Sequence, residues 1–207
     1  NKGAGDLSGI NTLNKYMEAF GLNSPTGVEI SELYDSMSQY PTHISSPEYK
    51  KYITQQRDAD AKESDYKWSA GDTIRTAIGQ SYNNYTSALM SKYVATLANG
   101  GTRYSMHFLN KVTNNDGKTE EEYQPKVESK IEIKKENLDA IFKGMFLVTT
   151  GPRGTLRNYF KDFPVDVAAK SGTAQQSSKR SEHTTFVAFA PLEDPQISVC
   201  VIIPFGN

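Results

Sequence analysis

Cysteine and histidine are scarce in this chain of 207 residues. The single cysteine, Cys200, lies in the apolar run ISVCVIIP, so no disulfide can form within the chain and we expect a buried structural thiol there. The three histidines, His43, His107 and His183, are far apart in sequence and lack the spacing of metal ligands. We therefore predict neither a disulfide framework nor a metal centre, and we expect no cofactor.

The chain also lacks an excess of one charge and a long hydrophobic run. Its 23 basic and 24 acidic residues interleave and give a net charge of −1. Such a pattern does not suit a surface that neutralises phosphates, so nucleic acid is not an expected partner. No apolar run reaches the ~20 residues of a membrane span, and no segment has the form of a signal peptide. We therefore expect any membrane anchor to lie outside these residues.

Helical periodicity appears in three parts of the sequence. Residues 10–22, 86–101 and 135–150 each repeat apolar side chains at the spacing of one helical face, and glycines follow the first two. Residues 41–67 are instead polar, with as many positive as negative charges. We interpret that segment as a surface excursion with at most a helical turn, and not as part of the core.

Strand patterns fill much of the remainder. Asp116 and Gly117 predict a tight hairpin turn within residues 104–128, because glycine readily adopts the positive φ that such a turn needs. The last forty residues predict three strands joined by short connections, which favour antiparallel neighbours, at roughly 165–175, 184–190 and 196–204. The predicted fold class is therefore α/β in the α+β sense, with helices packed against an antiparallel sheet.

The stretch VDVAAKSGTAQQ, residues 165–176, places a lysine and small hydroxyl residues at the end of an apolar approach. Lys170 supplies a positive charge, Ser171 supplies a hydroxyl, and Gly172 leaves room for a ligand along the strand. Thr173 adds a second hydroxyl and a backbone N–H. These groups suit a substrate with a carboxylate and a reacting carbonyl. A solvated strand end can show the same residues by chance, so the tripeptide alone leaves that alternative open.

Four separated segments resemble class B penicillin-binding proteins, and most nearly the penicillin-binding protein 2 type. In the family's order they are LNKYMEAFGLNSPTGVEI, WSAGDTIRTAIGQSYNNYTSALMSKYVATLANGGTRY, AAKSGTAQ and HTTFVAFAPLEDPQISVCVIIP. The resemblance covers nearly all of the chain. It implies the penicillin-binding transpeptidase fold, which serine β-lactamases share, in incomplete form. Residues 1–207 would then be the C-terminal portion of a transpeptidase domain that lacks the upstream nucleophile segment.

The lysine stretch matches the third motif of the wider family, K-T-G, with serine in place of threonine. The resemblance implies that Lys170 maintains the charge and proton network of the site, while Gly172 completes the motif. It also implies that Ser171 and Thr173 bind the substrate carboxylate, and that the N–H of Thr173 belongs to the oxyanion hole. Gln175 is expected to take part in substrate binding.

Two other stretches match the first two motifs by spacing, and we interpret both matches as accidental. Ser64 and Lys67 fit S-x-x-K, but their surroundings are acidic and polar and lack the helix start that activates such a nucleophile. Ser81 and Asn83 fit S-x-N inside a segment that the family already accounts for. We therefore expect the nucleophilic serine to lie upstream of Asn1 and the isolated chain to be inactive.

The resemblance implies a peptidoglycan D,D-transpeptidase that cross-links stem peptides through a serine acyl-enzyme and is inhibited by β-lactams. It implies a membrane-anchored bacterial protein acting in cell-wall synthesis and cell shape at the extracytoplasmic face, with other cell-wall synthesis proteins as candidate partners. Two alternatives stay open, namely a β-lactam sensor or serine β-lactamase of the same fold, and a non-catalytic relative. The GDTIRTAIGQ segment and the hairpin at 104–128 favour the transpeptidase.

Overall fold

The computed structural model describes residues 6–30, 42–175 and 180–206, which form two compact units. The first unit lies within residues 1–25 and 31–86, and the second takes residues 26–30 together with the chain from residue 87 onward. Across the described ranges, every helix falls short of the length or the apolar character that crossing a bilayer requires.

The first unit is built from helices. They are α1 (Ser8–Ala19), α2 (Pro47–Arg57), α3 (Glu63–Tyr66) and α4 (Ala70–Ala77). The predicted first helix is confirmed, and Gly21 follows it with a φ of 78°, the left-handed conformation in which glycine ends helices without strain. The prediction of a mere surface excursion at 41–67 was wrong. Ser46 caps α2, and Ile44 and Ile53 are buried. Two isoleucines are enough to pack this otherwise polar segment against a core.

A buried carboxylate organises the start of α4. Asp72 is 1% exposed and closes a capping box with Ser69 at the head of the helix. Its two oxygens also bind Lys50 Nζ at 2.9 Å and Arg75 at 2.6 Å. Burial raises the pKa of Asp72, but the hydrogen bonds from Ser69, Lys50 and Arg75 outweigh burial and lower this pKa to about 2. The ionised carboxylate is therefore a structural element of the first unit.

The second unit combines helices with antiparallel strands. In chain order its elements are α5 (Ser87–Ala98), β1 (Thr102–Tyr104), β2 (Lys111–Thr113), β3 (Thr119–Glu122), β4 (Val127–Lys130), α6 (Lys135–Thr150), α7 (Arg157–Phe160), β5 (Ala168–Ala174), β6 (His183–Ala190) and β7 (Ile197–Ile203). The two predicted helices and the three C-terminal strands are confirmed. The predicted hairpin is also confirmed, since β2 pairs with β3 across a turn in which Gly117 has a φ of 79°. The short helix α7 was not predicted.

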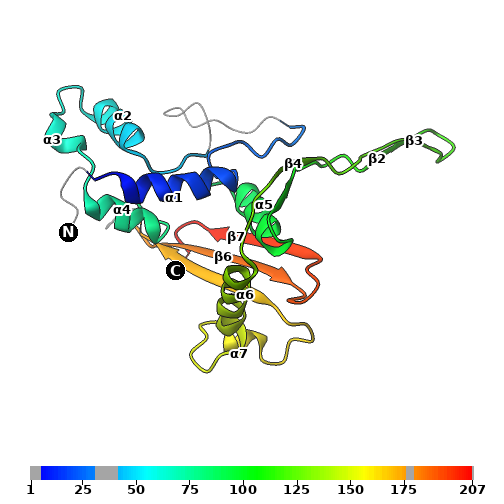
Figure 1. Cartoon of the computed structure of the whole chain (residues 1–207). Helices are drawn as coiled ribbons and strands as arrows, with labels where there is room; N and C mark the ends of the chain where they lie inside the picture. Colours follow the sequence, from blue (N-terminus) through cyan, green and yellow to red (C-terminus); the bar gives the residue numbers. More distant parts are fainter. Residues whose placement is uncertain (1–5, 31–41, 176–179, 207) are drawn as a thin grey trace. The chain divides into compact units, whose positions relative to one another are not determined.

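Strands β5, β6 and β7 form one sheet in that order, and the helices α5 and α6 lie against it (Figure 1). Both pairings are antiparallel, and the β5–β6 register runs without a bulge from Ala168 opposite Phe189 to Ala174 opposite His183. β5 is thus an edge strand of this sheet within the described residues. No further strand pairs with its outer edge among the residues that the structure describes.

The two faces of the sheet bury different clusters. On one face, Ala168 and Phe189 pack with Val94 of α5 and with partly buried side chains of α6. On the other face, Ala169 packs with Ala188 beside α7. These clusters fix β5 from both sides at its N-terminal end. The part of β5 that precedes Lys170 is therefore packed on both faces.

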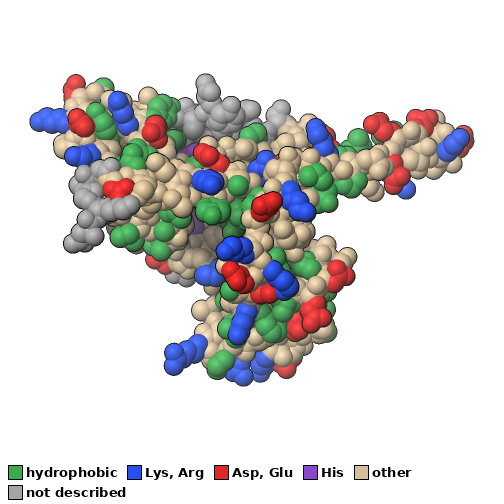
Figure 2. Space-filling view, viewed as in Figure 1, with side chains coloured by type: hydrophobic (Ala, Val, Ile, Leu, Met, Phe, Trp, Pro, Cys, Tyr) green, Lys and Arg blue, Asp and Glu red, His purple; other side chains and the backbone are tan. Residues whose placement is uncertain are grey.

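Charged side chains of both signs are scattered over the surface seen in Figure 2. They follow the interleaved sequence, whose net charge is −1.

Candidate functional site

Four of the predicted site residues are the third to sixth residues of β5. Because the register is unbroken, side chains alternate along the strand. Lys170 and Gly172 lie on the face of Ala168, and Ser171 and Thr173 lie on the opposite face. The structure thus brings the two hydroxyl residues to one side of an edge strand.

Lys170 is exposed, and its Nζ donates a hydrogen bond to the carbonyl of Ser171. No carboxylate of the described residues neutralises it. A cation without an internal counter-charge at a strand edge attracts an anionic group of a ligand. The charge of Lys170 is therefore available to whatever binds along β5.

Gly172 leaves space that the fold itself does not need. A Cβ built at this position would meet only the Cβ of Thr185, at 3.9 Å, which is an ordinary van der Waals contact. Packing within the described residues therefore tolerates a side chain here. The opening over Gly172 suits a ligand lying close to the backbone of β5.

Thr155 lies beside Ser171, although no pattern in the sequence points to it. Its Oγ1 lies 3.2 Å from the Oγ of Ser171, and either hydroxyl can donate. Thr155 lies in the turn between α6 and α7, so its position depends on how that turn folds back onto β5. No spacing in the sequence signals such a contact between distant segments.

Gln175 directly follows β5 and is exposed. The structure assigns it no hydrogen bond among the described residues, so its side chain is available to a ligand. Gln176, the last residue of the stretch that drew attention in the sequence, lies outside the described residues. The expected contribution of Gln175 to substrate binding stays a prediction.

The comparisons with known proteins agree with one another. Residues 6–207 match the family described as Penicillin binding protein transpeptidase domain. The chain belongs to this family. It is 31% identical to the peptidoglycan D,D-transpeptidase MrdA of Escherichia coli strain K12 over 96% of the chain, which corresponds to 31% of that protein. The chain therefore spans about a third of the length of this curated relative.

Solved structures show the same fold. Penicillin-binding protein 2B from Streptococcus pneumoniae strain R6 matches with a TM-score of 0.76 and 24% identity, over all of this chain and 31% of the other. Pseudomonas aeruginosa PBP2, solved in complex with WCK 5153, matches with a TM-score of 0.71 and 29% identity, over 95% of this chain and 40% of the other. The predicted penicillin-binding transpeptidase fold is confirmed.

The surroundings of Ser64 do not resemble the nucleophile site of a penicillin-binding transpeptidase. Ser64 is exposed on the four-residue helix α3, and its hydroxyl bonds to the neighbouring Asp65 at 3.3 Å. In an S-x-x-K site the lysine activates the serine hydroxyl, whereas the hydroxyl of Ser64 contacts Asp65. Lys67 accepts a hydrogen bond from Lys50 through its carbonyl, which is a structural contact.

Asn83 likewise makes structural hydrogen bonds in the first unit. Its Oδ1 accepts a hydrogen bond of 2.8 Å from the N–H of Ser45, and its Nδ2 donates to the carbonyl of Gln80. Ser81 is exposed and has a φ of 72° in the turn before it. These contacts of Asn83 hold the chain near Ser45, and the interpretation of the S-x-N match as accidental stays a prediction.

Cys200 is half-buried, so the expectation of a buried thiol was wrong in degree. Burial raises the pKa of this thiol, which makes it a weak nucleophile at neutral pH. Within the described ranges, no group of three or more His, Cys, Asp and Glu side chains is arranged to hold a metal ion.

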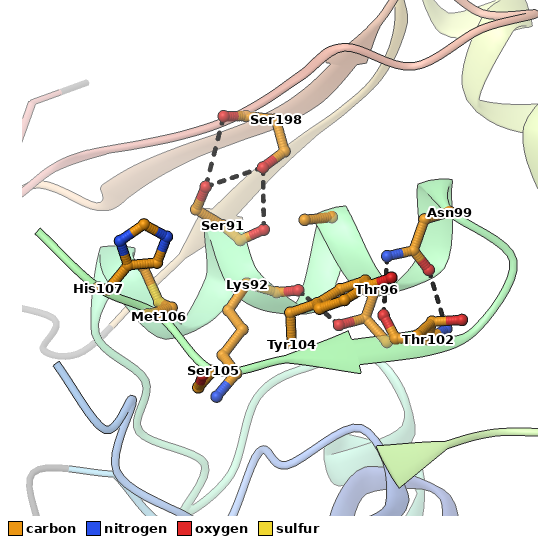
Figure 3. A pocket seen from close by; sticks show the side chains of 11 residues that line it. Ser91, Lys92, Thr96, Asn99, Thr102, Tyr104, Ser105, Met106, His107 and Ser198 are labelled. Carbon is orange, nitrogen blue, oxygen red and sulfur yellow. Dashed lines mark hydrogen bonds between the residues drawn. The ribbon is translucent and has the colours of Figure 1, made fainter. Parts of the chain in front are cut away.

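A pocket of about 270 Å³ lies elsewhere in the second unit, between α5 and the segment that follows β1 (Figure 3). On its β7 side, the Oγ atoms of Ser91 and Ser198 are 3.1 Å apart, and the Ser198 hydroxyl also bonds to the carbonyl of Ser91. The lysine stretch on β5 does not contribute to its lining. This pocket is therefore separate from the candidate site.

Proposed function

We propose that the full-length protein is a peptidoglycan D,D-transpeptidase that forms a serine acyl-enzyme and is inhibited by β-lactams. The observation that carries this proposal is the edge strand β5. One of its faces carries Lys170, which pairs with no carboxylate of the described residues, and the open space at Gly172, and the other carries the hydroxyls of Ser171 and Thr173. Membership of the penicillin-binding transpeptidase family supports it, as does the similarity to the peptidoglycan D,D-transpeptidase MrdA of E. coli.

In this proposal a serine outside residues 1–207 attacks the carbonyl of the penultimate D-alanine of a stem peptide. The bond to the terminal D-alanine breaks, and that residue leaves with a proton on its amine. The amine of a second stem peptide then attacks the acyl-enzyme, forms the cross-link and releases the serine. Both additions place negative charge on a carbonyl oxygen, so a fixed donor such as the N–H of Thr173 assists both steps.

The residues of β5 take the recognition role. The stem peptide ends in a carboxylate, which the ammonium of Lys170 attracts and the hydroxyls of Ser171 and Thr173 bind as donors. The peptide lies along the open edge of β5, over Gly172. β-Lactams carry a carboxylate beside a reactive carbonyl, so they occupy the same groups and acylate the same serine.

This assignment places the catalytic domain at the extracytoplasmic face of the bacterial membrane, where stem peptides are cross-linked. Other proteins of cell-wall synthesis are the expected partners.

Acylation and deacylation rates of the full-length protein test the proposal. A fluorescent penicillin should label it covalently at a 1:1 ratio, and the adduct should persist. Rapid hydrolysis of the adduct would favour a serine β-lactamase, which turns its substrate over. Failure to form any adduct would favour a non-catalytic relative.

A further inference from the structure

We propose that Thr155 is a positioning residue that orients the hydroxyl of Ser171 for the substrate carboxylate. The inference rests on the proposed function and adds a residue to it. Its basis is the contact of 3.2 Å between Thr155 Oγ1 and Ser171 Oγ, which links the turn after α6 to the edge strand β5.

The turn that carries Thr155 is fixed against the end of α6. Gly154 donates its N–H to the carbonyl of Gly151 at 2.8 Å, and Leu156 donates its N–H to the carbonyl of Val148 at 3.1 Å. A Cβ at Gly154 would lie 2.5 Å from the carbonyl oxygens of Leu147 and Val148. The backbone of the turn therefore packs against the end of α6 too closely for a side chain at this position. A turn held this tightly presents its next side chain, Thr155, in one place.

The turn after α6 also contacts the start of β5. Leu156 packs against the cluster of Val167 and Ala169 at the start of β5. The hydroxyl of Thr149, in the last turn of α6, donates to the carbonyl of Val167 at 2.7 Å. Helix end, turn and strand therefore form one framework, which sets the distance between Thr155 and Ser171.

The number of hydroxyl protons decides which residue donates in the contact between Thr155 and Ser171. Ser171 has a single hydroxyl proton, which it must donate if it is to bind a carboxylate. Its oxygen can then accept a proton from Thr155. In that arrangement Thr155 donates to Ser171, and Ser171 donates to the substrate. Without Thr155, the Ser171 hydroxyl can rotate away from the ligand, and ordering it costs part of the binding free energy.

The contact between Thr155 and Ser171 is expected to add little to the stability of the fold. Thr155 is exposed, and a hydrogen bond between two hydroxyls that water can reach contributes little to folding. Its consequence is the orientation of Ser171. The Lys170 ammonium meanwhile holds the carbonyl of Ser171, so side chain and backbone of this residue are each positioned by a neighbour.

A double-mutant cycle in the full-length protein tests the role. Acylation rate constants with a fluorescent penicillin would be measured for Thr155→Val, Thr155→Ser, Ser171→Ala and the double variant Thr155→Val with Ser171→Ala. We expect Thr155→Val to slow acylation about threefold to tenfold, the equivalent of one hydrogen bond. Thr155→Ser, which keeps the hydroxyl, should restore most of the rate. In the Ser171→Ala background, Thr155→Val should have no further effect.

Thr150→Val is the matched control, because Thr150 is exposed and its hydroxyl bonds only within α6, to the carbonyl of Phe146 at 2.9 Å. It should acylate at the normal rate. The inference is overturned if Thr155→Val acylates normally, or if it slows acylation equally with and without the Ser171 hydroxyl. If instead the unchanged protein forms no adduct, or Ser171→Ala does not slow adduct formation, the proposed function of β5 is wrong and the role of Thr155 is overturned with it.

Discussion

The hydroxyl of Thr149 lies 2.7 Å from the carbonyl oxygen of Val167 and 2.8 Å from that of Phe146, so its one proton is shared between them, and Thr149 and Val167 are both buried. The bond to Val167 joins the end of α6 to the residue before β5. Thr149→Val keeps the shape of the side chain but leaves a buried carbonyl without its donor. We expect the free energy of unfolding to fall by about 1–3 kcal/mol, measured by urea denaturation. Thr149→Ser should recover part of the loss, and equal stability of Thr149→Val and the unchanged protein would show that the bond is unimportant.

Asp72 should make stability depend on pH in the acid range. Its pKa in the folded protein is about 2, below the ordinary value of 3.8. The ionised carboxylate therefore stabilises the fold fully above about pH 4, and this contribution of about 2 kcal/mol is lost as the pH falls toward 2. Melting temperatures of the unchanged protein and Asp72→Asn should thus differ most near neutral pH and converge toward pH 2. A gap that stays constant with pH would contradict this account.

Lys170→Ala should separate activity from stability. Loss of a fixed charge from the site is expected to lower the acylation rate by about a hundredfold or more. The melting temperature should change little, because the side chain is exposed. Lys143→Ala, which removes an exposed lysine from α6, is the control and should change neither quantity. A large loss of stability in Lys170→Ala with acylation preserved would indicate a structural role instead.

Acylation of the variants Gly172→Val and Thr173→Val tests whether the ligand lies along β5. A Cβ at Gly172 would contact only the Cβ of Thr185 among the described residues, at 3.9 Å, so the melting temperature of Gly172→Val should be nearly normal while acylation is strongly slowed. Thr173→Val removes one hydroxyl but keeps the backbone N–H. Its expected loss in acylation free energy is about 1.5–3 kcal/mol, as for a hydrogen bond to a charged group. Normal acylation by Gly172→Val beside a defective Thr173→Val would mean that the ligand follows another path.

Local patterns in the sequence predicted the elements that local forces determine. The three C-terminal strands follow from apolar segments with short connections, and the hairpin follows from Asp116 and Gly117, where the turn requires a positive φ. The same logic missed the burial of Ile44 and Ile53, because only the tertiary fold selects which apolar residues of a polar segment enter the core. Helix formation outside the periodic segments, as in α4 and α7, was missed for the same reason.

The candidate site was predictable only in part. Lys170, Ser171, Gly172 and Thr173 are neighbours in sequence, so one strand suffices to bring them together, and alternation predicts their faces. Thr155 is sixteen residues from Ser171 and reaches it through a hydroxyl contact across a turn. That contact depends on how the backbone at Gly154 packs against α6. Such packing leaves no periodic signal in a single sequence.

Intact-mass measurement of the full-length protein after incubation with benzylpenicillin tests the central claim most directly. The account predicts one adduct per molecule, located by peptide mapping on a serine outside residues 1–207, and formed much more slowly in Lys170→Ala. Absence of an adduct would contradict the proposed acyl-enzyme. An adduct on Ser64 or on another serine within residues 1–207 would contradict the assignment of β5 as the recognition strand for a nucleophile elsewhere in the protein.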